Sequence, residues 1–323
     1  MTKSTAARLA CALVATALPL SALAQATQKP MRVILPVSAG SGVDAIVRAA
    51  STALSKSLGQ PVVVDNIPGA GGVTGTAAIV KAAPDGTTIG VISNNHVTNP
   101  SVYKSLPYDS IADITPIAIV GSTPFLLVVN PARLPAKNVK ELVALLKAKP
   151  GEYNYASSGN GTIIHFAGAM FADEAGVDIK HIPYKGTGPM VTDLIGGQVD
   201  LGIVSLPAAQ GHLKSGALRA IGVGGATRSA AAPDIATIAE QGLPKYEVAG
   251  WFAVVGPARL APPEVKRIHD AFAAAYTSPE VKEAMARQGN EINVGTPEAA
   301  GAFIRAEIEK YAKVAKKVGM QLD

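Results

Sequence analysis

Length, composition and charge narrow the class of protein before any motif is considered. The chain has 323 residues, of which 48% are hydrophobic and only 16% are charged. This excludes a disordered chain, which combines low hydrophobicity with high net charge, and it allows one large or two moderate domains. The net charge of +5 comes from 29 basic and 24 acidic residues, without the basic run that marks a nucleic-acid-binding surface. The single cysteine, Cys11, excludes an intrachain disulfide and a multi-cysteine metal site.

The first 24 residues have the pattern of a secretory signal peptide. Lys3 and Arg8 form a basic start, residues 9–20 are apolar, and Ala22-Leu23-Ala24 is a small-residue cleavage signal. One alternative is a membrane anchor, which needs about 20 apolar residues. The other is a lipoprotein, which needs a cysteine after the apolar stretch, whereas Cys11 lies inside it. We therefore predict cleavage near Ala24 and export to a periplasm.

Segments that resemble strands and helices alternate along the rest of the chain. Apolar runs that end at glycine or proline turns predict strands at 31–37, 61–65, 87–93, 117–120, 125–130, 153–157, 179–183, 199–204, 218–222 and 251–256. Helical spacing of apolar or small residues predicts helices at 43–58, 73–83, 139–149, 162–176, 187–196, 207–215, 263–276, 279–288 and 297–318. This alternation predicts parallel sheets with helices on both faces.

So many strands favour two α/β lobes over one sheet. The strand that starts at Phe125, after Pro124, is the candidate first crossing between lobes, and 251–256 is the candidate return. We predict one lobe from 25–124 and 250–323, and a second lobe from 125–249. A TIM barrel is the alternative, which the long helical C-terminus and the proline-punctuated middle fit poorly.

Two glycine-rich turns, each between a strand and a helix, are candidate ligand-binding loops. The first loop, 36–44, offers Ser38, Gly40, Ser41, Val43 and Asp44. The second loop, 156–162, offers Ser157, Asn160, Gly161 and Thr162. Backbone N–H groups and the helix dipole at such turns favour a bound carboxylate or phosphate. Ligands bind at the carboxyl ends of parallel strands, so the two loops are expected to face one cleft.

Several of these residues also have a structural interpretation. Asp44 would repel an anion, so it either caps its own helix or contacts an amine, hydroxyl or water of the ligand. His165, in the helix after the second loop, either packs in the protein or binds the ligand. Asp200, at the start of a strand, is more typical of an internal cap or pair. Four further polar residues belong to ordinary loops or line the same cleft: Asn94, Asn95, Tyr184 and Lys185.

The sequence gives little support for a cofactor, a metal or catalysis. The spacing of Gly69, Gly71 and Gly75 is one residue longer than the dinucleotide fingerprint, which favours a structural turn or a site wall. The five histidines form no metal-binding motif, and G-x-S-x-G is absent. We predict no cofactor, no metal and no catalytic residue. The alternative is a periplasmic hydrolase that uses Ser157 and His165.

A series of motifs runs in order along almost the whole mature chain. They are VDNIPGAGG at 64–72, PDG at 84–86, VYKSLPYD at 102–109, YASSGNGT at 155–162 with His165, PYKG at 183–186, GGQVD at 196–200, ATIAEQG at 236–242 and WF at 251–252. Together they resemble the Bug family, the substrate-binding proteins of tripartite tricarboxylate transporters. One departure lies in the first loop, where Val37-Ser38-Ala39-Gly40-Ser41 stands in place of the family's Phe-x-Pro-Gly-Gly.

The resemblance implies a periplasmic binding protein of the type II-like fold, with two doubly wound α/β lobes around a ligand cleft. It also implies that loops from both lobes hold the carboxylate of a small organic acid, which carries over to 38–44 and 157–162. The partners implied are this acid and the membrane permease subunits of the transporter, with no nucleic acid. We expect a monomer. A solute sensor that acts on a membrane kinase is an alternative use of the same fold and ligand.

Overall fold

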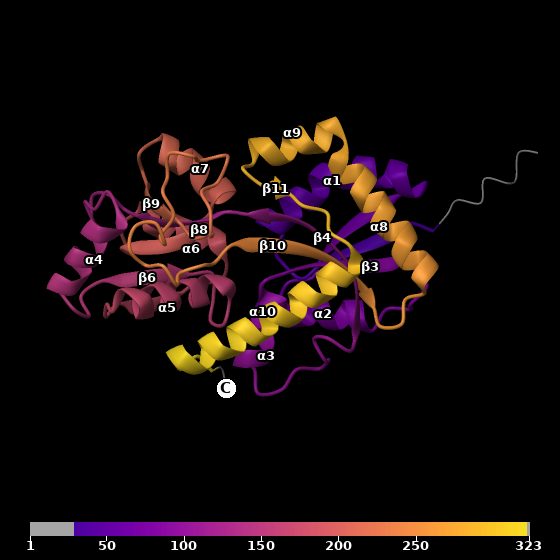
Figure 1. Cartoon of the computed structure of the whole chain (residues 1–323), viewed down its shortest axis with the longest axis horizontal. Coiled ribbons are helices and arrows are strands. Elements are labelled where there is room, and N and C mark those ends of the chain that lie inside the picture. The colour runs from indigo at the N-terminus through magenta and orange to yellow at the C-terminus, as the bar shows by residue number, and fades with distance from the viewer. Residues whose placement is uncertain (1–28, 322–323) are drawn as a thin grey trace, which may run out of the picture.

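The computed structural model describes residues 29–321, so the predicted signal peptide lies outside the described residues. Two β-sheets form the frame of this part of the chain (Figure 1). The first has six strands in the order β11 (Glu291–Ile292), β4 (Ile114–Thr123), β10 (Gly250–Pro257), β3 (Thr88–Ser93), β1 (Met31–Leu35) and β2 (Val62–Asn66). The second has five strands in the order β7 (Lys180–Pro183), β6 (Asn154–Ser157), β8 (Leu201–Ser205), β5 (Phe125–Val129) and β9 (Arg219–Val223).

Helices pack around both sheets. Those that contact the six-stranded sheet or one another beside it are α1 (Gly42–Leu58), α2 (Val73–Val80), α3 (Asn95–Val102), α8 (Pro262–Thr277), α9 (Pro279–Arg287) and α10 (Pro297–Val318). Those of the five-stranded sheet are α4 (Val139–Ala148), α5 (Ile163–Ala175), α6 (Thr187–Ile195) and α7 (Leu206–Lys214). We call each sheet with its helices the six-strand lobe and the five-strand lobe. Helix α10 contacts both, touching β4, α3 and α5 (Figure 1).

Alternating side chains bury both faces of the six-stranded sheet. Along β1, Met31, Val33 and Leu35 belong to a core cluster that includes α1, α8 and α9, whereas Ile34 belongs to the cluster on the other face. Figure 1 shows α1, α8 and α9 on one side of this sheet and α2, α3 and α10 on the other. This is the period-two alternation of a strand buried on both faces, and it confirms the predicted helix-covered sheets.

Both sheets are mixed, so the prediction of parallel sheets was wrong for part of each. β2, β1 and β3 run parallel, as do β7, β6 and β8, because helices join these strands. β10 is antiparallel to both β3 and β4, and β5 is antiparallel to both β8 and β9. The antiparallel strands border the two crossings between the sheets, where no helical crossover sets the direction. Two open sheets also exclude the TIM barrel.

The two crossings between the sheets lie next to the strands that we predicted for them. The chain leaves the six-stranded sheet at Thr123, passes Pro124, and enters the five-stranded sheet at Phe125. It returns to the six-stranded sheet at Gly250. These strand ends lie next to the predicted limits of the lobes, 124 and 250, and those limits stay a prediction.

Replacing Gly250 by alanine is expected to destabilise the fold at the second crossing. An added Cβ would lie 2.4 Å from Thr123 Cγ2 and 3.0 Å from Phe125 Cζ, and such overpacking costs about 1–3 kcal/mol. Gly211 in α7 is the matched control, since it is exposed and a Cβ there meets no heavy atom within 4 Å. Alanine at 211 should be neutral or stabilise by up to about 1 kcal/mol. Urea unfolding measures both free energies, and equal values for the two variants would contradict the crowding at Gly250.

Candidate ligand-binding site

The first loop is closed by the side chain of Asp44. This carboxylate is 4% exposed; its Oδ2 accepts the Gly40 N–H at 2.9 Å, and its Oδ1 accepts from Arg48 Nε at 2.8 Å. Burial raises the pKa of Asp44, but the hydrogen bond from Gly40 and the contacts with Asn66 and Arg48 outweigh it and lower the pKa. Of the two interpretations of Asp44, these contacts support the structural one.

A short network ties the first loop to the end of β2. Arg48 donates to Asn66 Oδ1 at 2.8 Å, and Asn66 Nδ2 donates to the Val37 carbonyl at 3.2 Å. The other predicted residues of this loop differ in exposure. Ser38 and Gly40 are exposed, Ser41 is half-buried and caps α1, and Val43 is in the core. Ser38 and Gly40 are therefore the predicted site residues of this loop that face solvent.

The second loop is held by hydrogen bonds within itself. Thr162 is the N-cap of α5: its Oγ1 accepts the His165 N–H at 3.4 Å and donates to the Gly159 carbonyl at 2.8 Å. Gly161 N–H donates to His165 Nδ1 at 3.1 Å. Ser157 is fully buried, and its Oγ accepts the Gly159 N–H at 3.2 Å. The loop is thus set in shape before α5 begins.

Two histidines stack behind the second loop. The rings of His165 and His181 lie 3.7 Å apart at 8°, and His181 Nε2 is 2.6 Å from Ser157 Oγ. Tyr155 lies close to both rings, stacked on His181 with the centroids 4.9 Å apart and tilted against His165 at 6.4 Å. Burial lowers the pKa of His165 to about 4, and burial together with the neighbouring His165 lowers the pKa of His181 to about 4. Both rings are therefore neutral near pH 7.

The sequence analysis missed His181. Its position in the strand just before the PYKG motif was the available signal, but its contact with Ser157 spans 24 residues and no local pattern encodes it. Ser157 therefore bonds to His181 and not to His165, its partner in the hydrolase alternative. His165 Nδ1 instead accepts the N–H of Gly161.

Acid should destabilise the protein through this histidine pair. In the folded protein both pKa values are about 4, against 6.5 ordinarily, so the unfolded chain binds more protons between these values. The contribution of the two histidines to the free energy of unfolding is then fully present above about pH 6.5. It is lost as the pH drops towards 4, by at most about 1.4 kcal/mol per pH unit for each ring.

Glutamine substitutions at His165 and His181 test this dependence. The slope of unfolding free energy between pH 6.5 and 4.5 should shrink in each single variant and further in the double variant. His96, whose pKa burial also lowers to about 4, stays in all of them and keeps its own share of the slope. An unchanged slope in the double variant would show that the stacked rings titrate normally.

The two adjacent asparagines before and within α3 have different partners. Asn94 is 1% exposed; its Nδ2 donates to the Ala249 carbonyl at 2.9 Å, and its Oδ1 accepts the Trp251 N–H at 3.1 Å. Asn95 Oδ1 accepts the N–H of Ile163 in the other lobe at 3.0 Å. Asn94 therefore binds the returning strand, whereas Asn95 joins the six-strand lobe to the start of α5.

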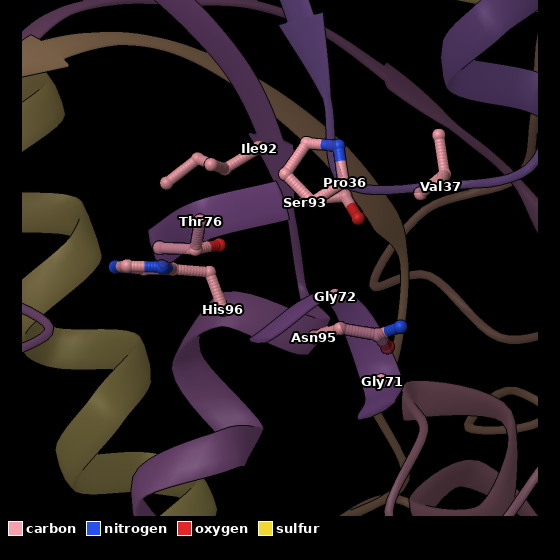
Figure 2. Close-up of a pocket in the computed structure, with 9 residues that line it drawn as sticks. All are labelled: Pro36, Val37, Gly71, Gly72, Thr76, Ile92, Ser93, Asn95 and His96. Carbon is pink, nitrogen blue, oxygen red and sulfur yellow. The ribbon is translucent and has the colours of Figure 1, made fainter. Parts of the chain in front are cut away.

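A small cavity lies between the first loop, the turn Ala70–Gly72 and α3 (Figure 2). Its volume is about 10 Å³, roughly the space of one water molecule. It is lined by Pro36, Val37, Gly71, Gly72, Thr76, Ile92, Ser93, Asn95 and His96. Figure 2 shows the Asn95 amide and the His96 ring pointing in opposite directions. The glycine turn that contains Gly69 and Gly71 thus contributes a wall of this cavity, beside one predicted site residue, Asn95.

The remaining predicted residues lie around the second loop or away from it. Tyr184 N–H donates to the Ser157 carbonyl at 2.9 Å, and its hydroxyl donates to Asp193 at 2.7 Å. Burial and Asp193 raise the pKa of Tyr184 to about 12. Asn160 and Lys185 are exposed. Asp200 is an internal pair, as its position suggested: it accepts from Arg133 at 3.2 Å and from the Asn154 N–H at 3.0 Å.

Two further properties concern the described part of the chain as a whole. Between residues 29 and 321, no group of three or more His, Cys, Asp or Glu side chains is placed to hold a metal ion. Over the same range, no helix combines the length and the apolar character needed to cross a membrane.

Known proteins are similar to this chain in both sequence and architecture. A model of the tripartite tricarboxylate transporter family receptor matches residues 46–320. Protein BugT of Bordetella pertussis is 38% identical over 296 residues, which cover 91% of this chain and 90% of BugT. A Rhodopseudomonas palustris protein solved with adipate is 32% identical, with a TM-score of 0.85 over 91% of this chain and 99% of that one. MatC from the same species, solved with bound malate, is 26% identical, with a TM-score of 0.81 over 88% and 98%.

These matches span both sheets and nearly all of the described residues. They confirm the two-lobe fold of a periplasmic binding protein, and they confirm the family that the order of motifs predicted. The chain belongs to the tripartite tricarboxylate transporter receptor family of solute-binding proteins.

Proposed function

We propose that this protein captures a small organic carboxylate between the first and second loops and delivers it to membrane permease subunits. The observation that carries the proposal is the start of α5. Its capping loop brings backbone N–H groups to the edge of the five-strand lobe, and Asn95 of the six-strand lobe meets it there. Helix starts favour anions through these N–H groups and the helix dipole. Adipate and malate in two related structures support this class of ligand.

The charges around the two loops also suit an anion. Asp44, the carboxylate of the first loop, is paired with Arg48 and bonded to the Gly40 N–H. Behind the second loop, His165 and His181 are neutral near pH 7. No net negative charge from these three groups therefore opposes a bound carboxylate. The residues we assign to ligand contact are Ser38, Gly40, Ser41, Asn160, Gly161, Thr162, His165, Tyr184 and Lys185. Asn95 lies beside them at the start of α5.

Capture and release need no chemical step, and the geometry gives no reason to add one. Ser157, the nucleophile of the hydrolase alternative, is fully buried and bonded within its own loop. We propose a monomer that is exported after cleavage near Ala24, in keeping with the periplasmic binding proteins it resembles. A sensor would use the same ligand site, and co-purification of the closed form with permease subunits or with a kinase separates these two uses.

A thermal-shift screen of the mature protein, residues 25–323, tests the ligand class. Adipate, malate and citrate form the carboxylate set, and adipamide is the uncharged control matched to adipate. A ligand at 100 times its Kd adds about 2.7 kcal/mol to stability, so at least one acid should raise the Tm by several degrees while adipamide does not. Stabilisation by adipamide or by amines alone would contradict the proposal.

The first loop is tested by Gly40→Ala against Gly176→Ala. Both glycines have a positive φ, 78° and 60°, and an added Cβ meets nothing within 4 Å at either position. Both variants should lose a similar stability, on the order of 1 kcal/mol, because alanine is strained there. Only Gly40→Ala should weaken binding of the acid found in the screen, since Gly176 ends α5 far from its start. Equal Kd values, measured by calorimetry, would remove the first loop from the site.

A further inference from the structure

The start of α5 is held by a residue of the other lobe. The first N–H groups of a helix have no acceptor within the helix, and Ile163 is the first residue of α5. Its N–H donates to Asn95 Oδ1 at 3.0 Å, across 68 residues of sequence. Two nearby N–H groups already have other acceptors: Gly161 N–H donates to His165 Nδ1, and His165 N–H donates to Thr162 Oγ1. Asn95 therefore completes the cap of α5 from outside the five-strand lobe.

A second hydrogen bond joins the same two segments. Thr98, one turn further along α3, donates its hydroxyl to the Gly161 carbonyl at 3.2 Å. Thr98 is fully buried, and Gly161 and Ile163 are buried as well. The two lobes are thus in direct polar contact here. The Thr98–Gly161 bond is buried and the Asn95–Ile163 bond is partly buried, which makes both stronger than fully exposed bonds.

The Asn95 oxygen occupies the position that an anion would take. A carboxylate accepts a helix N–H more strongly than a neutral amide does, because the bond is charge-assisted and the dipole favours negative charge. The cavity beside Asn95 has a volume of only about 10 Å³, roughly one water molecule. An organic acid can therefore reach Ile163 only after Asn95 has moved away.

The neighbouring residue links this contact to the crossing between lobes. Asn94 binds the Ala249 carbonyl and the Trp251 N–H, where the chain re-enters the six-stranded sheet. Trp251 is the only tryptophan of the chain. A change in the Asn94–Asn95 segment is therefore reported by the fluorescence of one known side chain.

We propose that Asn95 is a latch: its side-chain oxygen holds the two lobes together at the start of α5 and competes with the ligand for that position. The position of the ligand rests on the proposed function, whereas the latch is a property of the protein by itself. Binding exchanges one acceptor for another on Ile163 N–H, and the amide of Asn95 is released as the carboxylate arrives. Asn95 would then set the affinity by opposing the ligand rather than by contacting it.

The first test needs no ligand. Asn95→Ala removes the acceptor, and Asn293→Ala is the matched control at an exposed asparagine near β11. X-ray scattering of the mature protein should give a larger radius of gyration for Asn95→Ala, and peptides that contain Ile163 should exchange amide hydrogen faster. Trp251 fluorescence should change in the same variant. The control should match the wild type in all three. An unchanged radius and unchanged exchange in Asn95→Ala overturn the latch.

The second test uses adipate and malate as probes, in calorimetric titrations of each variant. If Asn95 competes with the ligand, Asn95→Ala should bind the acid that binds the wild type about three- to tenfold more tightly, the equivalent of one net hydrogen bond. Asn95→Asp should bind it more weakly, because its charge both holds the helix start and repels the acid. Weaker binding by Asn95→Ala would show a direct ligand contact and overturn the competition. If neither acid nor citrate binds the wild type, the proposed function fails, and the scattering experiment still decides the latch.

Discussion

The antiparallel pairing of β10 with β4 is the interaction on which the two-lobe arrangement depends. Gly250, where the chain returns to the six-stranded sheet, lies in register opposite Thr123, where the chain leaves it. The two crossings between the lobes therefore lie side by side, at the paired ends of β4 and β10, and every residue of β10 is buried. Asn94 adds its two hydrogen bonds to the same backbone, at Ala249 and Trp251. The segment 124–249 is covalently joined to the six-strand lobe only at these two crossings, so rotation of one lobe against the other is the expected motion.

Helix α10 is the second element that limits such a motion. Its Glu307 accepts a hydrogen bond from Trp251 Nε1 at 3.1 Å beside the crossing. One turn further on, Tyr311 packs edge-on against Phe166 of α5, with both rings fully buried. Its last turn forms an ion pair, Lys317 with Asp173, that is largely exposed and so contributes at most about 1 kcal/mol. The buried aromatic contact, rather than the ion pair, is therefore what fastens the end of α10 to the five-strand lobe.

Local signals predicted the strands and helices well, because alternation, helical spacing and glycine turns act over a few residues. α1 shows this: its apolar positions at 43, 46, 47, 50, 54 and 58 are readable in the sequence, whereas its cap, Ser41, was predicted only as a ligand-binding residue. α3 was missed, since Asn95–Val102 has low helix propensity and contains Pro100. The two-residue strand β11 was missed because its only support is pairing with β4. The antiparallel direction of β5 and β10 was missed for the same reason, as strand direction depends on partners far away in sequence.

The same distinction between local patterns and contacts of distant residues applies to the candidate site. The two loops could be predicted as candidates because a glycine turn between a strand and a helix is a local pattern, and the family motifs cover the second of them. The partners that give the residues their roles were not readable: Arg48 and Asn66 for the first loop, His181 for Ser157, and Ile163 for Asn95. Each of the last two joins residues more than 20 positions apart, and only the folded chain brings them together.

These partners also suggest how one scaffold can serve different acids. In the proposed site Asp44 is paired with Arg48, and His165 and His181 are neutral near pH 7. We therefore expect backbone N–H groups, helix starts and the exposed Lys185 to supply the attraction for an anion. Backbone donors recognise the carboxylate end of a ligand and carry no information about the rest of it. Selectivity must then come from the walls of the cleft. Val37 lines the small cavity. The resemblance to the Bug family implies a phenylalanine at this position, and valine is smaller than an aromatic ring. The loops can therefore keep their shape while single wall residues change the acid that fits.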